Sequence, residues 1–274
     1  MTDILFILLI STAILIGFTI GLLGGGGSIL AVPVFVYLFH IEPHTATSYS
    51  LFVVGVSSIL ATLQNLNKGI IQYKIGIAFA LPVFVVIFCV RKFLLPIIPD
   101  VIYQGSLFTL KQGEALMLLF AIVMLVASIS MIKGREKVEP NSLGASEENE
   151  HQLNYFLLLL QGVFVGLITG LVGAGGGFLI IPALVILARI PMKSAIATSL
   201  VIISINSLIG FSGDIGTVKI DWSFLGLFSL IALAGVFVGL YVNSKIENEK
   251  LRKIFGYFVL LMGIFILVKE IFLD

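Results

Sequence analysis

"GLLGGGGSIL" at Gly21–Leu30 places four consecutive glycines inside a run that contains no Asp, Glu, Lys or Arg from Ile4 to Ile41. The flanking residues are typical of a lipid-facing helix, whereas consecutive glycines destabilise a helix interior. A second stretch, "GLVGAGGGFLI" at Gly170–Ile180, nearly repeats the first. The two stretches therefore predict helices that are interrupted at the glycines.

Composition defines the broad class of the protein. The 274 residues are 59% hydrophobic and 11% charged, with a mean hydropathy of +1.16, whereas soluble domains carry about 25% charged residues. Apolar runs of about 20 residues indicate an all-α polytopic membrane protein. The net charge of +1 gives no electrostatic case for a nucleic-acid partner, and the single Cys89 excludes an internal disulfide.

Charge-free runs predict ten apolar segments: Ile4–Leu23, Ile29–Phe39, Thr45–Leu66, Ile75–Val90, Ala115–Ile132, Leu153–Val172, Phe178–Ala188, Ser194–Phe211, Trp222–Val242 and Ile254–Val268. The first lacks a basic amino-terminal region, so we expect a membrane helix and not a cleaved signal peptide. The second and seventh have only 11 residues each, too few to cross a hydrocarbon core of about 30 Å. Each of these two follows a glycine cluster and carries a proline, Pro33 or Pro182, at its fifth residue.

The two halves of the chain are an internal repeat. A shift of 149 residues without gaps places Gly17 on Gly166, Gly24 on Gly173 and Pro33 on Pro182. The same shift aligns "ATSYSL" at 46–51 with "AIATSL" at 195–200, and "IQY" at 71–73 with "IDW" at 220–222. Shared hydrophobicity alone would not align glycines and prolines, so the register indicates a duplication.

The duplication predicts three regions: a first membrane repeat at 1–132, a charged cytoplasmic linker at 133–152 and a second membrane repeat at 153–274. Because each repeat has about five segments, an odd number, we expect the second repeat to be inverted relative to the first. Arg91–Glu114 mixes charged and apolar residues, and we expect it at the membrane interface.

Basic residues predict the orientation in the membrane. With the termini outside the bacterial inner membrane, eleven Lys and Arg fall in cytoplasmic loops and five fall outside, in agreement with the positive-inside rule. The cytoplasmic set is Lys68, Lys74, Lys133, Arg135, Lys137, Arg189, Lys193, Lys245, Lys250, Arg252 and Lys253, and the outer set is Arg91, Lys92, Lys111, Lys219 and Lys269.

The glycine clusters favour a binding site. Irregular backbone is tolerated within a bilayer where it is buried in protein or lines a cavity, and broken helices of this kind build the substrate sites of secondary transporters. We expect the two clusters to form one anion cradle, since the free amides of a helix start attract anions. Its glycines and adjoining serine are Gly24, Gly25, Gly26, Gly27, Ser28, Gly173, Gly175, Gly176 and Gly177.

Other small residues have a simpler interpretation. Gly17, Gly21, Gly166, Gly170, Gly235 and Gly239 are spaced as seams that let two membrane helices approach closely. Polar residues within the segments are further candidate ligands, although a Ser or Thr commonly bonds its own helix and Asn or Gln can join helices. The candidate ligands are Ser50, Thr198, Ser199 and Asn206, and Gln64, Asn65 and Ser207 could line the same path.

Enzyme chemistry is not indicated. "GLLGGGGS" lacks the Lys-Ser/Thr ending of a P-loop, and "GAGGG" lacks the dinucleotide-binding spacing. The three histidines lie at loop ends and no Asp pair falls within a segment. We expect no catalytic residues, no metal and no cofactor; Asp214 and Asp221 flank a loop and are expected at the interface.

The repeated element resembles the TauE/SafE family of bacterial membrane transporters. The resemblance rests on "GLVGAGGG" at 170–177 and its first-half version "GLLGGGGS", the following proline, "AIATSL" and "IDW". The first half departs from this pattern at Tyr49, where the second has Thr, and at Gln72-Tyr73, where the second has Asp-Trp. The family is associated with export of sulfite and organosulfur anions.

The resemblance and the glycine breaks together predict a secondary transporter of a small anion, with sulfite or a related sulfur oxyanion or sulfonate as the default substrate. The proposed mechanism is alternating access at a site between the repeats. A passive anion channel and a cation-coupled transporter of another small solute remain alternatives. The expected partners are the anion and the lipid bilayer, and a homodimer is left open.

Overall fold

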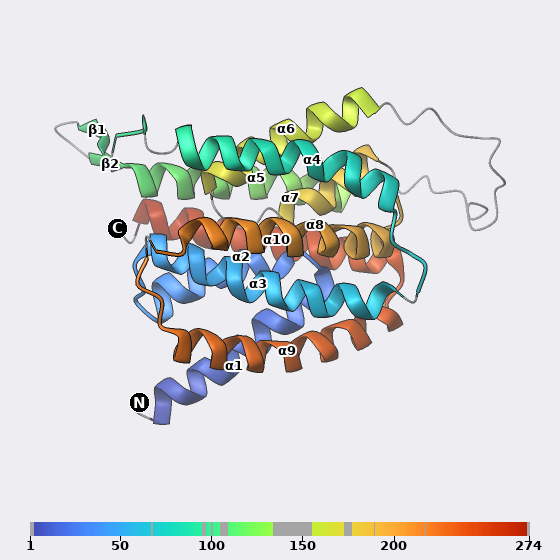
Figure 1. Cartoon of the computed structure of the whole chain (residues 1–274), viewed down its shortest axis with the longest axis horizontal. Helices are drawn as coiled ribbons and strands as arrows, with labels where there is room; N and C mark the ends of the chain where they lie inside the picture. Colours follow the sequence, from blue (N-terminus) through green and yellow to red (C-terminus); the bar gives the residue numbers. More distant parts are fainter. Residues whose placement is uncertain are drawn as a thin grey trace.

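The computed structural model describes residues 3–66, 68–94, 97–99, 101–104, 109–133, 155–172, 177–188, 190–216 and 218–272. Ten α-helices lie within these ranges (Figure 1): α1 Asp3–Leu23, α2 Gly26–Pro33, α3 Pro43–Leu66, α4 Tyr73–Cys89, α5 Gln112–Lys133, α6 Tyr155–Val172, α7 Gly177–Pro182, α8 Met192–Asp214, α9 Trp222–Lys245 and α10 Asn248–Phe272. They confirm the ten apolar segments predicted from the sequence.

Seven of the described helices are long and apolar enough to cross a membrane. Their outer faces are also apolar: Ile7 is 65% exposed and Leu230 is 70% exposed. A helix that is apolar on its inner and outer faces belongs in a protein core or in lipid, and these faces are not covered by protein. The chain is therefore a polytopic all-α membrane protein.

The connection between α4 and α5 holds the one β-structure ribbon in the described part of the chain. Strand β1, Val101–Gln104, pairs antiparallel with β2, Thr109–Lys111. The ribbon projects from the end of the helix bundle at which α10 also ends (Figure 1). It lies within Arg91–Glu114, which the sequence assigns to the interface without predicting strands.

Both short helices continue as a π-helical turn directly after their proline. In the first half the turn is Val34–Leu38 and in the second it is Ala183–Leu187. Proline has no amide hydrogen and displaces the preceding carbonyl, so the usual bonding pattern changes there. The amide of Phe39 donates to Val34 O at 3.3 Å and that of Ala188 donates to Ala183 O at 3.2 Å, again one repeat apart.

Helix packing follows the register of the duplication. Helix α1 packs against α9, and their counterparts α6 and α4 pack against each other. A Cβ on Gly17 would overlap the carbonyl group of Ala232, and a Cβ on Gly166 would lie 2.9 Å from Val83 O. Gly166 and Val83 are the repeat equivalents of Gly17 and Ala232, so the second contact corresponds to the first.

The duplicated helices α5 and α10 run antiparallel to each other. Gly256, early in α10, lies against Ile132 at the end of α5, whereas the later Gly263 lies against Met124. Helices α3 and α8 are also antiparallel neighbours, since Gly55 lies against Leu208 and Gly210 lies against Leu51. An inverted repeat requires this arrangement; the inversion stays a prediction, which these contacts support.

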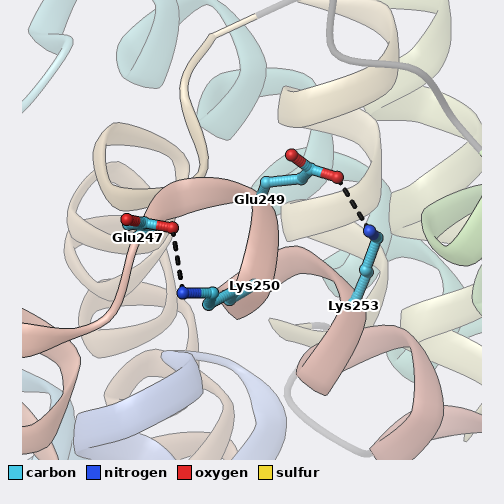
Figure 2. A network of polar contacts seen from close by, with 4 residues as sticks. All are labelled: Glu247, Glu249, Lys250 and Lys253. Atoms are coloured by element: carbon cyan, nitrogen blue, oxygen red, sulfur yellow. Dashed lines mark ion pairs between the residues drawn. The ribbon is translucent and has the colours of Figure 1, made fainter.

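The two ends of the bundle differ in what they carry. Both chain termini lie at one end, and α5 ends and α6 begins at the opposite end (Figure 1). At that opposite end, Glu247 pairs with Lys250 at 3.2 Å and Glu249 with Lys253 at 2.7 Å (Figure 2). All four side chains are at least half exposed, so these pairs mark a water-facing surface and contribute little to stability.

Candidate functional site

The first glycine cluster interrupts the chain between α1 and α2. Helix α1 ends at Leu23, Gly24 has a φ of +65°, and α2 begins at Gly26. A positive φ is costly for residues with a side chain and nearly free for glycine. The amide of Gly24 still donates to Ile20 O at 2.8 Å, so the chain reverses in a tight turn where the sequence predicts a break.

The two breaks meet backbone to backbone. A Cβ on Gly25 would overlap the main chain of Gly177, the first residue of α7, and a Cβ on Gly177 would overlap that of Gly25. The latter Cβ would also lie 2.7 Å from the side chain of Ile203, the middle residue of α8. The contact therefore lies about halfway along a full membrane helix. Of the second cluster, Gly173, Gly175 and Gly176 lie outside the described residues.

Gly27 has a packing role that the sequence does not predict. A Cβ on Gly27 would overlap the side chain of Ile20 and would lie 2.9 Å from Ile16 O. Gly27 thus lets α2 fold back against α1. Gly26 and Ser28 belong to the first turn of α2.

The seam glycines behave as predicted. A Cβ on Gly235 would overlap Ile14 O, and one on Gly239 would overlap Phe18 O. A Cβ on Gly21 would overlap Val236 O on α9. These glycines bring α1 and α9 into close contact, as small residues do in membrane helix pairs.

Ser199 lies beside the first break, but its hydroxyl group already donates a hydrogen bond within its own helix. The side chain is fully buried, and Oγ donates to Ile196 O at 2.9 Å. A Cβ on Gly24 would lie 3.3 Å from this Oγ. In this conformation Ser199 bonds its own helix, the common fate of such residues, and its hydroxyl proton is not available to an anion.

Thr198 faces a different helix from Ser199. Its Oγ1 accepts a hydrogen bond from the backbone amide of Gln72 at 3.0 Å, directly before α4 begins. In the other half, Tyr49 Oη accepts from the amide of Asp221 at 2.7 Å, directly before α9 begins. Tyr49 aligns with Thr198 and Gln72 with Asp221. In each repeat, therefore, a side-chain oxygen accepts a hydrogen bond from the backbone amide directly before a helix of the other repeat.

The two Asp residues at the α8–α9 connection also have protein partners. Asp221 caps α9, accepting from the amides of Ser223 and Phe224 at 3.0 Å each. Asp214, at the end of α8, accepts from Ser48 Oγ at 2.6 Å. Within the described residues no group of three His, Cys, Asp or Glu side chains is placed to hold a metal ion.

A group of buried polar side chains lies where α3 and α8 cross. Ser57, Ser58 and Ser207 are fully buried and Asn206 is 6% exposed. Their Oγ atoms and Asn206 Nδ2 have no hydrogen-bond partner among the described residues. Unpaired polar atoms are costly in a membrane interior, so these atoms call for a partner such as water or a ligand. Ser50, predicted as a ligand, is also buried on α3.

The internal repeat relates these four residues to one another as two equivalent pairs. Ser57 aligns with Asn206 and Ser58 with Ser207. Gly55 brings the helices together here, since its Cβ would lie 3.3 Å from Ser207 Cβ. Asn206 and Ser207 are among the residues predicted from the sequence, whereas Ser57 and Ser58 are not. The repeat register, which relates Ser57 and Ser58 to those two residues, is the signal that could have predicted them.

The geometry defines a class of protein: a polytopic helical membrane protein with two interrupted helices that meet at its centre. Comparison with known proteins also indicates a membrane protein. The family model described as "Sulfite exporter TauE/SafE" matches residues 9–266. A "Probable membrane transporter protein" of Methanocaldococcus jannaschii is 34% identical, covering 96% of this chain and 97% of its own. One of Xylella fastidiosa (strain Temecula1) is 28% identical, covering 92% and 91%. No solved structure matches significantly.

The chain belongs to the TauE/SafE sulfite exporter family. The family and the names of its relatives indicate a membrane transporter and not an enzyme.

Proposed function

We propose that this protein is a secondary transporter that moves a small anion, sulfite or a related sulfur oxyanion or sulfonate, across the bacterial inner membrane. The observation that carries the proposal is the contact between Gly25 and Gly177, where two interrupted helices meet beside the midpoint of α8. A site formed where two repeats meet at mid-depth suits alternating access, in which the repeats move against each other around the substrate.

Neutral donors would recognise the anion at this centre. A helix start presents free amides and a partial positive charge, and the α3/α8 crossing adds buried hydroxyl and amide groups without assigned partners. Buried Lys or Arg would bind an anion more tightly but would also cost more to hold in the membrane. Weak, neutral coordination is compatible with release of the substrate on the other side.

The orientation is part of the proposal. The end with both termini would face outwards, and the end with the Glu247–Lys250 pair would face the cytoplasm. The support is the excess of basic residues in the loops of the second end.

Two other functions use the same fold. A passive channel would conduct the anion without a conformational cycle, and unwound backbone carbonyls could instead bind a cation. Flux in proteoliposomes, with sulfite, sulfate and sodium gradients in separate arms, distinguishes the cation site from the proposal, and counterflow of the labelled anion distinguishes the channel. We expect sulfite to drive flux with or without sodium. Sodium-driven flux that no anion affects would contradict the proposal.

A further inference from the structure

Helices α4 and α8 leave two cavities between them. The larger, of about 360 Å³, lies in the half of the bundle nearer the termini, and its lining includes Phe84, Ile87 and Ile209. The smaller, of about 60 Å³, lies towards the opposite end, and its lining includes Gly76 and Val201. Helix α4 is therefore incompletely packed against α8 in both halves of the bundle.

The repeat-equivalent interface, between α9 and α3, is filled where the smaller cavity would fall. Val201 of α8, which lines that cavity, corresponds to Phe52 of α3. Tyr73 of α4, also in the lining, corresponds to Trp222 of α9. The rings of Phe52 and Trp222 pack edge to face, with their centres 6.1 Å apart, and Phe211 lies 4.9 Å from Phe52. Aromatic side chains thus close at one interface the space that is left open at the other.

Helix α9 is also held closely by its other neighbour, α1, at the edge of the bundle opposite α4 and α6 (Figure 1). A Cβ on Gly21 of α1 would lie 3.1 Å from the carbonyl carbon of Gly239, and one on Gly239 would lie 3.0 Å from Gly21 Cα. In α4 the equivalent of Gly235 is Val86, whose Cβ would lie 3.0 Å from a Cβ on Gly166 of α6. The α1/α9 seam therefore has glycine on both sides and the α4/α6 seam on one, and glycine on both sides allows the closer approach.

Two further features distinguish α4 from α9. Asn243 Nδ2 donates to Leu22 O at 2.6 Å and ties the end of α9 to α1, whereas the equivalent residue after α4 is Leu94, which has no side-chain donor. Pro82 lies inside α4 and removes one hydrogen bond from it, whereas its equivalent in α9 is Ile231. Since proline is a common cause of helix bending, α4 is the less restrained and the more readily bent of the two helices.

We infer that α4 is the moving gate of this protein and that α9 stays fixed, so that the two repeats contribute unequally to the transport cycle. The inference rests on the proposed transport function. In the conformation described, α4 meets α8 near Gln72, whose amide donates to Thr198 Oγ1, and leaves the larger cavity near the termini. Rocking of α4 about Pro82 closes that cavity and separates Gln72 from Thr198. The centre beside α8 is thereby exposed to one end of the bundle at a time.

The first test measures distances between spin labels in a Cys89→Ser background. One pair, Phe88→Cys with Ile209→Cys, joins α4 to α8 at the larger cavity. The control pair, Phe237→Cys with Leu60→Cys, joins α9 to α3 at the repeat-equivalent positions, and Phe88 and Phe237 are equally exposed at 50% and 51%. With the full chain in detergent, we expect two distance distributions for the first pair, whose proportions change when sulfite is added. The control pair should give one distribution that sulfite does not change.

The second test locks each interface with a short, reducible thiol crosslinker in the same background. The first pair, Tyr73→Cys with Val201→Cys, joins α4 to α8 at the smaller cavity. The control pair, Trp222→Cys with Phe52→Cys, joins α9 to α3 at the equivalent place. Relative to the same variant before crosslinking, we expect the first crosslink to abolish sulfite flux in proteoliposomes and its reduction to restore that flux. The control crosslink should leave the flux unchanged.

The outcomes separate failure of the inference from failure of the proposed function. Two distributions for both label pairs, or loss of flux with both crosslinks, would show that both repeats move and would overturn the inference. A single distribution for the α4–α8 pair in protein that transports sulfite, or unchanged flux with the first crosslink, would overturn it as well. Wild-type protein that moves no anion would remove the proposed function, whereas two distributions for the α4–α8 pair alone would still show that α4 is the helix that moves.

Discussion

At the scale of single residues, Gly25 and Gly177 bring the two interrupted helices into contact backbone to backbone. Each has its α-carbon against the main chain of the other, so no side chain fits between them. An added methyl group at either position would overlap backbone atoms, which cannot rotate away as the end of a flexible side chain can.

We therefore predict that Gly25→Ala separates the two interrupted helices. The added methyl group forces the backbones apart and should lower the melting temperature in detergent and abolish anion flux. Gly226→Ala adds the same methyl group where nothing lies within 4 Å and should change neither. A Gly25→Ala protein with wild-type melting temperature and flux would show that the contact between the breaks is not required.

Sequence predicts where the breaks fall but not the role of each glycine. The repeated clusters and their spacing locate the interruption at Gly24–Gly25. That Gly27 faces α1 and that Ser199 donates to Ile196 depends on how each helix is rotated against its neighbours. Rotation is set by tertiary packing, and a run of glycines carries no periodicity from which to infer it.

At the scale of elements, two equivalent hydrogen bonds join the repeats. Thr198 of α8 holds the amide before α4, and Tyr49 of α3 holds the amide before α9. These are also positions at which the two halves differ in sequence, Tyr for Thr and Gln for Asp. The different residues thus keep the same contact.

We predict that Thr198→Val and Tyr49→Phe each remove one such bond while preserving shape. Each should cost about 1 kcal/mol and lower the melting temperature by about 2–4 °C. The double variant should show nearly the sum, because the two bonds join different helix pairs. Thr198→Ser retains the hydroxyl group and serves as the control. A Thr198→Val protein as stable as wild type would mean that the amide of Gln72 finds another partner.

Element boundaries are predicted well and local geometry is not. Charge-free runs locate the boundaries of all ten described helices to within six residues because lipid exposure requires apolar side chains. The π-helical turns after Pro33 and Pro182 escape prediction, since proline permits a kink, a helix end or a π-turn alike. The β1–β2 ribbon is short and mixed in composition, and its pairing does not show as alternation.

At the scale of the whole molecule, a difference between the two ends of the helix bundle predicts its orientation in a membrane. The termini share one end of the bundle (Figure 1), and the loops at the other end hold most of the basic residues predicted to be cytoplasmic. With its π-turn, the short helix α2 extends roughly 20 Å, and α7 with its π-turn extends roughly 16 Å. The short helices lead the chain back to the end of the bundle at which α1 or α6 begins. The net crossing of the membrane by each repeat is therefore made by its other three helices.

We predict that membrane-impermeant thiol reagents distinguish the two ends. In a Cys89→Ser background, which removes the exposed native thiol, Lys219→Cys should be labelled from outside intact cells and Lys250→Cys should not. Permeabilised cells should label both, as the control for accessibility. Labelling of Lys250→Cys alone would reverse the orientation without affecting the duplication.

The central claim is that a small anion crosses by alternating access between the two halves. The most direct measurement is counterflow: proteoliposomes loaded with unlabelled propanesulfonate or sulfite are diluted into a trace of the labelled anion. Alternating access predicts transient accumulation of label above its equilibrium level, because the internal anion returns the site to the outside. Label that only equilibrates, without accumulation, would indicate a channel, and label that never enters would contradict anion transport altogether.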